Sequence, residues 1–223
     1  MQKTLDRIGS PKGYIKDPSL VLDFPLYLLD GSSIKDRSAY GHLGVVTGAL
    51  WTRQGRSFDG IDDKITIPDA PSLYLGTAHT QAFWVKIPSD TGADQMLINK
   101  DDADTNREWL SYYRTATKKI EWVIWTDTDH TVSQTNITPL NTWLFIAFRY
   151  DGTDMRIYTN GILDSTPTAV TGALVDKAAN ITLGVRNTTQ WLTASLGEVL
   201  LYNRALNPME VQRNFLATKW RYR

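Results

Sequence analysis

The sequence predicts an all-β protein: a sandwich of two antiparallel sheets with one short helix near the C-terminal end. Three observations support this fold class. Short segments with apolar residues at every second position recur along the chain, and a single stretch near the end carries the signals of a helix. Turn signals separate the segments at intervals of about ten residues, which is typical of a sandwich rather than of an α/β fold.

Length and composition fit one compact domain. The chain has 223 residues, 42% hydrophobic and 22% charged, and sandwiches of this size are commonly single domains. Basic and acidic residues number 24 each, so no positive field favours a nucleic-acid partner. Cysteine is absent, which excludes disulfides and thiolate metal sites.

Residues 1–19 are expected to form an arm or linker, and residues 20–223 the folded domain. Glycine and proline recur in the arm among mixed charges, at Gly9, Pro11, Gly13 and Pro18. The arm lacks the apolar segment of a secretory signal, and the longest apolar run, residues 20–29, is too short to span a bilayer. We therefore expect synthesis in the cytoplasm without a signal peptide, and no membrane insertion.

Strands are predicted in order along the chain. Alternating apolar and polar residues indicate strands at 64–67, 83–87, 120–125, 143–150, 155–159, 181–185 and 196–202. A Tyr-Asp-Gly turn at 150–152 joins the fourth of these to the fifth. Asn160-Gly161 then predicts a hairpin, because both central positions of a type I′ turn need positive φ.

The helix is predicted over residues 208–218. Asn207 can cap it, Pro208 fits the first helical position, and Glu210 stands three residues after the cap. Val211 and Phe215 provide its apolar side.

Short motifs that follow one another in order carry a resemblance to a known family. They are Asp36-Arg37-Ser38-Ala39-Tyr40-Gly41, Phe58-Asp59-Gly60-Ile61-Asp62-Asp63, Ala82-Phe83-Trp84-Val85-Lys86, Asn141-Thr142-Trp143, Tyr150-Asp151-Gly152 and Tyr202-Asn203-Arg204. From about residue 20 to residue 215 the chain resembles the laminin-G-like jelly-roll domains of the concanavalin A-like lectin/glucanase superfamily. The resemblance implies a jelly-roll sandwich. Gly197 is a departure, because the family usually has aspartate at this position.

The resemblance also implies a function class. Members of this superfamily are mostly binding or display modules, and a minority cleave glycans. The glucanases are similar to one another in a Glu-x-Asp-x-x-Glu strand, and neither Glu108 nor Glu121 stands in such a pattern. The histidines at 42, 79 and 130 are far apart and show no metal spacing. We therefore expect a protein that is not an enzyme.

A structural calcium ion is expected from the resemblance. Many relatives hold calcium near the ends of their sheets through aspartates, and Asp36 and Asp62 are the nearest candidates here. The aspartate-rich loop at 99–106 imitates the start of an EF-hand, but Arg107 replaces the required glycine. This loop is expected to be a solvated hairpin tip.

Aromatic residues are the best clue to a ligand. The chain has eight tryptophans, and sugar rings stack their C–H faces on indole rings. Five aromatic residues lie at strand ends or on the polar side of their alternation, and we expect them to form a glycan platform: Trp109, Tyr112, Tyr113, Trp125 and Trp191. Packing in the core is the alternative for each of them.

These observations predict a non-catalytic recognition or display module. We expect a surface-exposed part of a virion or similar assembly, a decoration or tail-associated protein, that also binds glycans. Its partners would be a glycan or a cell-surface or virion protein, with the arm joining it to its own copies or to capsid or tail subunits. One alternative is a free-standing carbohydrate-binding module, and the second is a glycan-cleaving enzyme with a carboxylate pair formed by folding.

Overall fold

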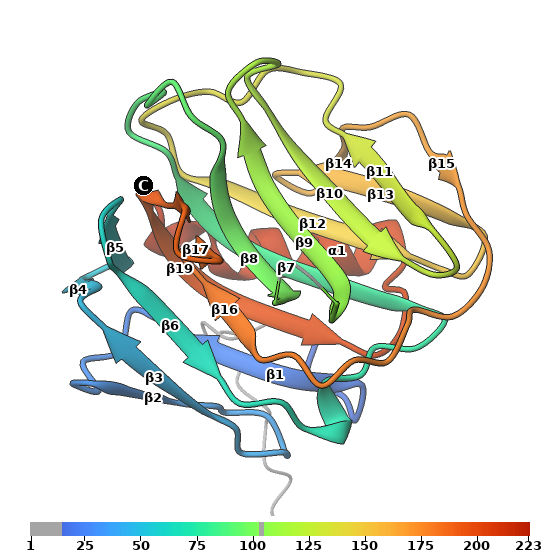
Figure 1. The fold of residues 1–223 in the computed structure, drawn as a ribbon, viewed down its shortest axis with the longest axis horizontal. Helices are drawn as coiled ribbons and strands as arrows, with labels where there is room; N and C mark the ends of the chain where they lie inside the picture. The colour runs from blue at the N-terminus through green and yellow to red at the C-terminus, as the bar shows by residue number, and fades with distance from the viewer. Residues whose placement is uncertain (1–14, 103–104) are drawn as a thin grey trace, which may run out of the picture.

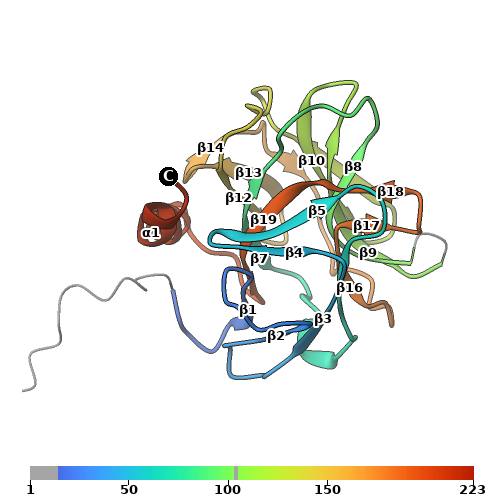
Figure 2. The ribbon, with the colours of Figure 1, turned by 90° about the vertical axis from the view of Figure 1, so that its left-hand side faces the viewer.

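The computed structural model describes residues 15–102 and 105–223, and these form two large antiparallel sheets that face each other (Figures 1 and 2). This confirms the all-β sandwich. We call the sheet whose outer face carries the helix the back sheet, and the opposite one the front sheet. Within the described residues no helix is long and apolar enough to cross a membrane.

The back sheet follows the order β14-β13-β12-β7-β19-β5-β4, and in addition β1 pairs with β19 and β15 with β13. Its strands are β1 (Leu20–Pro25), β4 (Leu50–Thr52), β5 (Gly55–Asp59), β7 (His79–Lys86), β12 (Leu144–Tyr150), β13 (Asp154–Thr159), β14 (Ile162–Leu163), β15 (Thr168–Ala169) and β19 (Thr193–Tyr202). The central strands β7 and β19 join segments more than a hundred residues apart in the chain.

The front sheet follows the order β11-β10-β9-β8-β16-β6-β3-β2. Its strands are β2 (Ser33–Lys35), β3 (Leu43–Thr47), β6 (Lys64–Ile67), β8 (Gln95–Asp101), β9 (Arg107–Arg114), β10 (Lys119–Trp125), β11 (Asp129–Ser133) and β16 (Ile181–Leu183). A small hairpin, β17 (Val185–Arg186) and β18 (Gln190–Trp191), adjoins β8, and two short 3-10 turns lie at Pro71–Leu73 and Lys219–Arg221.

The core lies between the sheets, where alternate side chains of both sheets meet. Trp122 of β10 stacks on Phe148 of β12, with ring centroids 5.2 Å apart, and so joins the front sheet to the back sheet. Both rings are wholly buried, and burying each stabilises the fold by about 2–3 kcal/mol. On β7, Phe83 and Val85 face this core while Trp84 faces the opposite way, as the alternation predicts.

Helix α1 (Pro208–Thr218) covers part of the outer face of the back sheet, as Figure 2 shows. The capping box is confirmed: Asn207 Oδ1 accepts from Glu210 N at 3.0 Å, and Glu210 Oε2 accepts from Asn207 N at 2.8 Å. Val211 of α1 is buried in a cluster with Trp84, and Phe215 packs against the same cluster. The predicted bounds of the helix agree with the structure.

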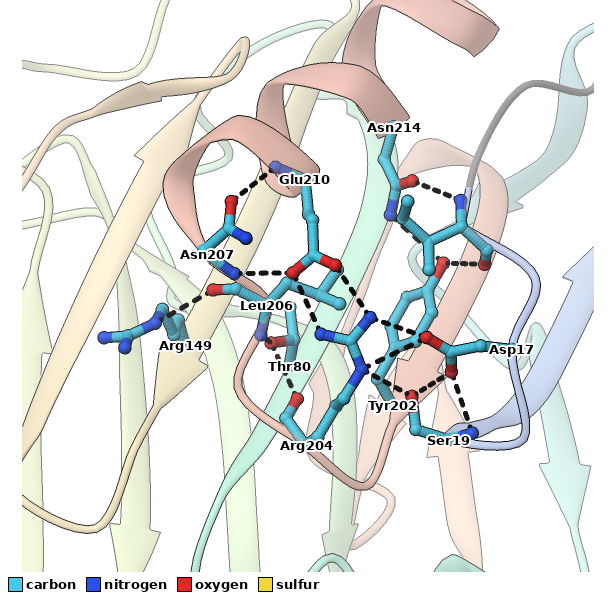
Figure 3. Close-up of polar contacts among 11 residues, drawn as sticks. Asp17, Ser19, Thr80, Arg149, Tyr202, Arg204, Leu206, Asn207, Glu210 and Asn214 are labelled. Carbon is cyan, nitrogen blue, oxygen red and sulfur yellow. Dashed lines mark hydrogen bonds and ion pairs between the residues drawn. The ribbon is translucent and has the colours of Figure 1, made fainter.

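The N-terminal segment is fastened to this helix and to the end of β19 (Figure 3). Ile15 N donates to Asn214 Oδ1 at 2.8 Å, and the Tyr202 hydroxyl donates to Ile15 O at 2.8 Å. The Arg204 guanidinium binds the carboxylates of both Asp17 and Glu210 (Figure 3). The predicted arm therefore contacts the domain from residue 15 onwards, while residues 1–14 lie outside the described residues.

Gly197 has a packing reason that the sequence does not reveal. A bulge interrupts the pairing of β19 with β7 between Leu196 and Val199, and the Tyr222 ring covers the backbone there. A Cβ on Gly197 would lie 2.5 Å from the Tyr222 Cε1 atom. The Tyr222 hydroxyl also accepts a hydrogen bond from Glu198 N at 2.7 Å. A larger residue at 197 would therefore require the Tyr222 ring to move.

Candidate functional site

The outer face of the front sheet carries a hollow of about 260 Å³, which we call the front hollow. Strands β8 to β11 form its floor, and the β17–β18 hairpin forms one side. Its lining combines aromatic, cationic, acidic and amide groups: Asp94, Met96, Arg107, Leu110, Tyr112, Arg114, Val123, Trp125, Asp129, Thr131, Arg186 and Gln190.

Strand register brings the floor residues together. Tyr112 of β9 lies opposite Met96 of β8 on one side and Glu121 of β10 on the other, and Trp125 lies opposite Asp129 of β11. Residues directly opposite one another share a face of the sheet. Met96, Leu110, Tyr112 and Val123 form a buried apolar cluster against which Trp125 packs half-buried, so the floor is apolar and its rim is polar.

Glu121 fixes the polar rim beside Tyr112. Its Oε2 accepts from the Tyr112 hydroxyl at 2.7 Å and from Arg114 Nε at 2.8 Å. Burial and the hydrogen bond to Glu121 raise the pKa of Tyr112 to about 12. Burial alone would raise the pKa of Glu121, but the hydrogen bonds from Arg114 and Tyr112 outweigh it and hold that pKa below its usual value. Glu121 is therefore an ionised carboxylate that positions Arg114, which is the opposite of what a general acid requires.

Arginines surround the hollow. The Arg107 Cζ atom lies 5.7 Å from the centroid of the Trp125 ring, and Arg114 Cζ lies 5.0 Å from that of Tyr112. Arg186 enters from the β17–β18 hairpin and pairs with Asp101 at 3.0 Å. Guanidinium groups stack on aromatic faces and donate paired hydrogen bonds, so these arginines can bind hydroxyl-rich or anionic ligands.

A model of the concanavalin A-like lectin/glucanases superfamily matches residues 59–212. The chain belongs to this superfamily. The two facing antiparallel sheets agree with its jelly-roll fold, as the motifs predicted. No curated protein matches the chain in sequence.

Two solved structures of similar fold are binding domains. The binding domain of botulinum neurotoxin serotype G superposes with a TM-score of 0.72 at 16% identity, covering 88% of this chain and 50% of its own. The binding domain of paraclostridial mosquitocidal protein 1 superposes with a TM-score of 0.69 at 20% identity, covering 88% of this chain and 52% of its own. The chain spans about half the length of these structures, and at these identities the likeness shows the fold.

The superfamily fold brings together only part of the predicted aromatic platform. Tyr112 and Trp125 both line the front hollow. Trp191 lies next to Gln190 in the adjoining hairpin, half-buried, with its Nε1 donating to Thr188 O at 3.0 Å. Trp109 and Tyr113 were wrongly assigned to an exposed platform, because both point into the core and are 0% exposed.

The sequence does not single out the arginines of the front hollow as site residues. Arg114 stands two residues after Tyr112 on the same strand, which is a signal for a shared face. Arg186 offers no such signal, because it joins the site only through the placement of the β17–β18 hairpin beside β8.

The two aspartates expected to bind calcium have different surroundings. Asp36 Oδ1 accepts from the backbone N of Asp23 and of Ser38, each at 2.8 Å, and its Oδ2 accepts from His42 N at 3.1 Å. Through these hydrogen bonds, the Asp36 carboxylate fixes the backbone of the loop in which it lies.

Asp62, by contrast, lies in a group with Asp59 and Asp63, whose carboxylate oxygens are within 4.8 Å of one another. Burial and the two neighbouring carboxylates raise the pKa of Asp63. Such a set of oxygen donors suits calcium. In the part of the chain that the structure describes, Asp36 belongs to no such group.

A buried pair of carboxylates, Asp23 and Glu198, lies in the back sheet where β1 pairs with β19. The Arg37 Nη2 atom lies 3.0 Å from Asp23 Oδ1 and 3.2 Å from Glu198 Oε1. Burial, followed by the charge of Asp23, raises the pKa of Glu198 to about 7. Glu198 is 3% exposed.

Proposed function

We propose that the chain is a non-catalytic recognition module that binds a glycan through the front hollow. This proposal rests on one observation: two aromatic rings and three arginines line the same hollow. The rings belong to Tyr112 and Trp125, and the arginines are Arg107, Arg114 and Arg186. The neurotoxin and mosquitocidal protein structures that share the fold are themselves binding domains, which supports a binding role for this chain.

The chemistry of the hollow fits a sugar ring. A sugar offers an apolar C–H face to an aromatic ring and a fringe of hydroxyls to charged and amide groups. Trp125 is half-buried at the edge of the floor, so one part of its ring is open to a ligand. Asp129, Thr131 and Gln190 supply hydrogen-bonding groups around it.

The carboxylates of the site support binding rather than cleavage. Glycosidases need an acid and a second carboxylate that are free to act on the two sides of one bond. Glu121 is committed to Tyr112 and Arg114, and Asp94 lies 3.7 Å from Arg114 Nη1. These two acidic groups hold Arg114 in place.

A glycan array with the purified protein, followed by calorimetry on the best glycan, tests the proposal. Trp125→Ala should weaken binding by roughly tenfold or more, since aromatic anchors carry much of the binding energy of such sites. Trp220→Ala is the matched control, because Trp220 is 47% exposed and lies in the C-terminal turn away from the hollow. Equal affinity of wild type and Trp125→Ala would contradict a front-hollow site, and turnover of a bound glycan would favour the enzyme alternative.

We further propose that the module is displayed on a larger assembly such as a virion, with the N-terminal arm as its anchor. Residues 15–19 contact α1 and the end of β19, on the back-sheet side, so an anchored arm would leave the front hollow facing outward. Removing residues 1–14 should leave the melting temperature unchanged and abolish co-sedimentation with the parent assembly. Undiminished co-sedimentation would favour a free-standing carbohydrate-binding module instead.

A further inference from the structure

The outer face of the back sheet carries a second hollow beyond the C-terminal end of α1, which we call the back hollow. It has a volume of about 380 Å³. Ser57 of β5, Ser195 of β19 and Lys86 of β7 stand directly opposite one another across neighbouring strands and line it. Their neighbours Ala194 and Leu196 point into the core, so these three side chains point outward.

The polar groups of this row have unused bonding capacity. Among the described residues, the Lys86 ammonium and the hydroxyls of Ser57 and Ser195 have no hydrogen-bond or ion-pair partner. Lys86 is only partly exposed, and no acidic side chain from the described residues lines the hollow. A partly buried cation without a counter-ion favours an anionic ligand.

Trp143 forms a fixed wall beside this row. Its Nε1 donates to Gln54 Oε1 at 3.0 Å, and its ring centroid lies 5.0 Å from that of Tyr222. Both contacts hold the indole in one orientation. The same indole also lines a further hollow of about 260 Å³, to which Lys219 and Arg223 contribute cations. The two hollows that share Trp143 thus combine an aromatic ring with cations and hydroxyls.

We infer that the back hollow binds a carboxylate-bearing sugar residue such as a uronic acid. The carboxylate would pair with the Lys86 ammonium, the ring hydroxyls would bond to Ser57 and Ser195, and the C–H face would lie on the Trp143 indole. The site is on the opposite sheet from the front hollow and shares no residue with it. The inference therefore stands or fails independently of the proposed function.

Two probes that differ only in the required charge test this inference. Methyl glucuronide and methyl glucoside share one ring, and only the former carries a carboxylate. Titration of each is followed by NMR through the indole N–H signal of Trp143, assigned by its loss in Trp143→Phe. We expect the glucuronide to shift this signal with roughly tenfold higher affinity than the glucoside, and the preference to weaken as salt rises.

Variants separate the charge from the fold. Lys86→Gln removes the charge but keeps a flexible polar side chain, and it should abolish the preference for glucuronide. Lys64→Gln, on β6 of the front sheet, is the matched control and should retain the preference. Ser195→Ala should weaken both probes. Trp125→Ala should change nothing at Trp143, which separates this site from the front hollow. Equal affinities for the two probes, no shift of the Trp143 signal, or an unchanged preference in Lys86→Gln would each overturn the inference.

Discussion

The guanidinium of Arg107 lies over the indole of Trp125, with 5.7 Å between the Arg107 Cζ atom and the ring centroid. The two residues come from the start of β9 and the end of β10, which run antiparallel, so the sheet itself brings them together. The cation restrains the indole that we propose as the sugar-stacking surface. The binding strength of the front hollow should therefore depend on this pair.

Replacing Arg107 tests that dependence. Arg107→Ala should weaken binding of the glycan selected by the wild-type protein by about fivefold, the loss expected for a cation–π contact of about 1 kcal/mol. Arg107→Lys should lie in between, because an ammonium keeps the charge without the planar stack. Calorimetry measures both, with Lys35→Ala on the far edge strand β2 as control. Full affinity in Arg107→Ala would mean that Trp125 needs no restraint.

Glu198 should make stability depend on pH. Its pKa is raised to about 7 in the folded protein by burial and then by Asp23, so the folded state holds this proton more tightly than the unfolded chain does. The stabilising contribution is fully present below the unfolded pKa, near 4.5, and is lost as pH rises through about 7.

Glu198→Gln keeps the shape of the side chain without its titration. Relative to this variant, the wild type should lose up to roughly 3 kcal/mol of unfolding free energy between pH 4.5 and pH 8. Urea unfolding of both proteins at the two pH values gives this difference. A constant difference between wild type and variant would show that Arg37 neutralises the carboxylate fully.

Arg204 should hold the N-terminal segment on the domain. Arg204→Ala removes the links to both Asp17 and Glu210, and a partly exposed network of this kind contributes about 1–2 kcal/mol. The variant should also expose the Ile15 amide, which donates to Asn214, to faster hydrogen exchange. Asn207→Ala provides the contrast, since it removes the helix cap at a similar cost of about 1 kcal/mol but leaves the Asp17 link intact. Equal exchange at Ile15 in the two variants would contradict the fastening role.

Calcium should stabilise the domain through Asp62 and its neighbours. A ligand that binds only the folded state raises the melting temperature, so adding calcium after chelation should raise it. Asp62→Asn should remove this response. Asp36→Asn should lower the melting temperature equally with and without calcium, because Asp36 organises its loop through backbone hydrogen bonds. If calcium does not change the melting temperature, then Asp59, Asp62 and Asp63 are turn residues and not metal ligands.

The fold could be predicted from the sequence because local signals agreed with it. Strand alternation, the Asn160-Gly161 turn and the Asn207 cap each act over a few residues, and each is confirmed. Faces were harder to assign on β9. One face carries Trp109, Ser111 and Tyr113, and the other carries Leu110, Tyr112 and Arg114. Both faces therefore mix aromatic and polar residues.

Only the position of the back sheet decides which face of β9 is buried. Trp109 and Tyr113 join the core cluster that also contains Phe148 of β12, a strand more than thirty residues away along the chain. Predicting the candidate site also requires knowing which distant segments of the chain lie side by side. Arg186 reaches the front hollow through a hairpin almost eighty residues from Arg107, a relationship that no local pattern encodes.

The contact between Gly197 and Tyr222 has an evolutionary consequence. Because a side chain at 197 and the aromatic ring at 222 would occupy the same space, a larger residue at 197 should be accompanied by a change at 222. A relative with aspartate in place of Gly197 should carry a small residue, or none, where this chain has Tyr222. Substitutions at these two positions should therefore be linked among relatives, since the small residue at 197 is what lets the C-terminal turn close over the sheet.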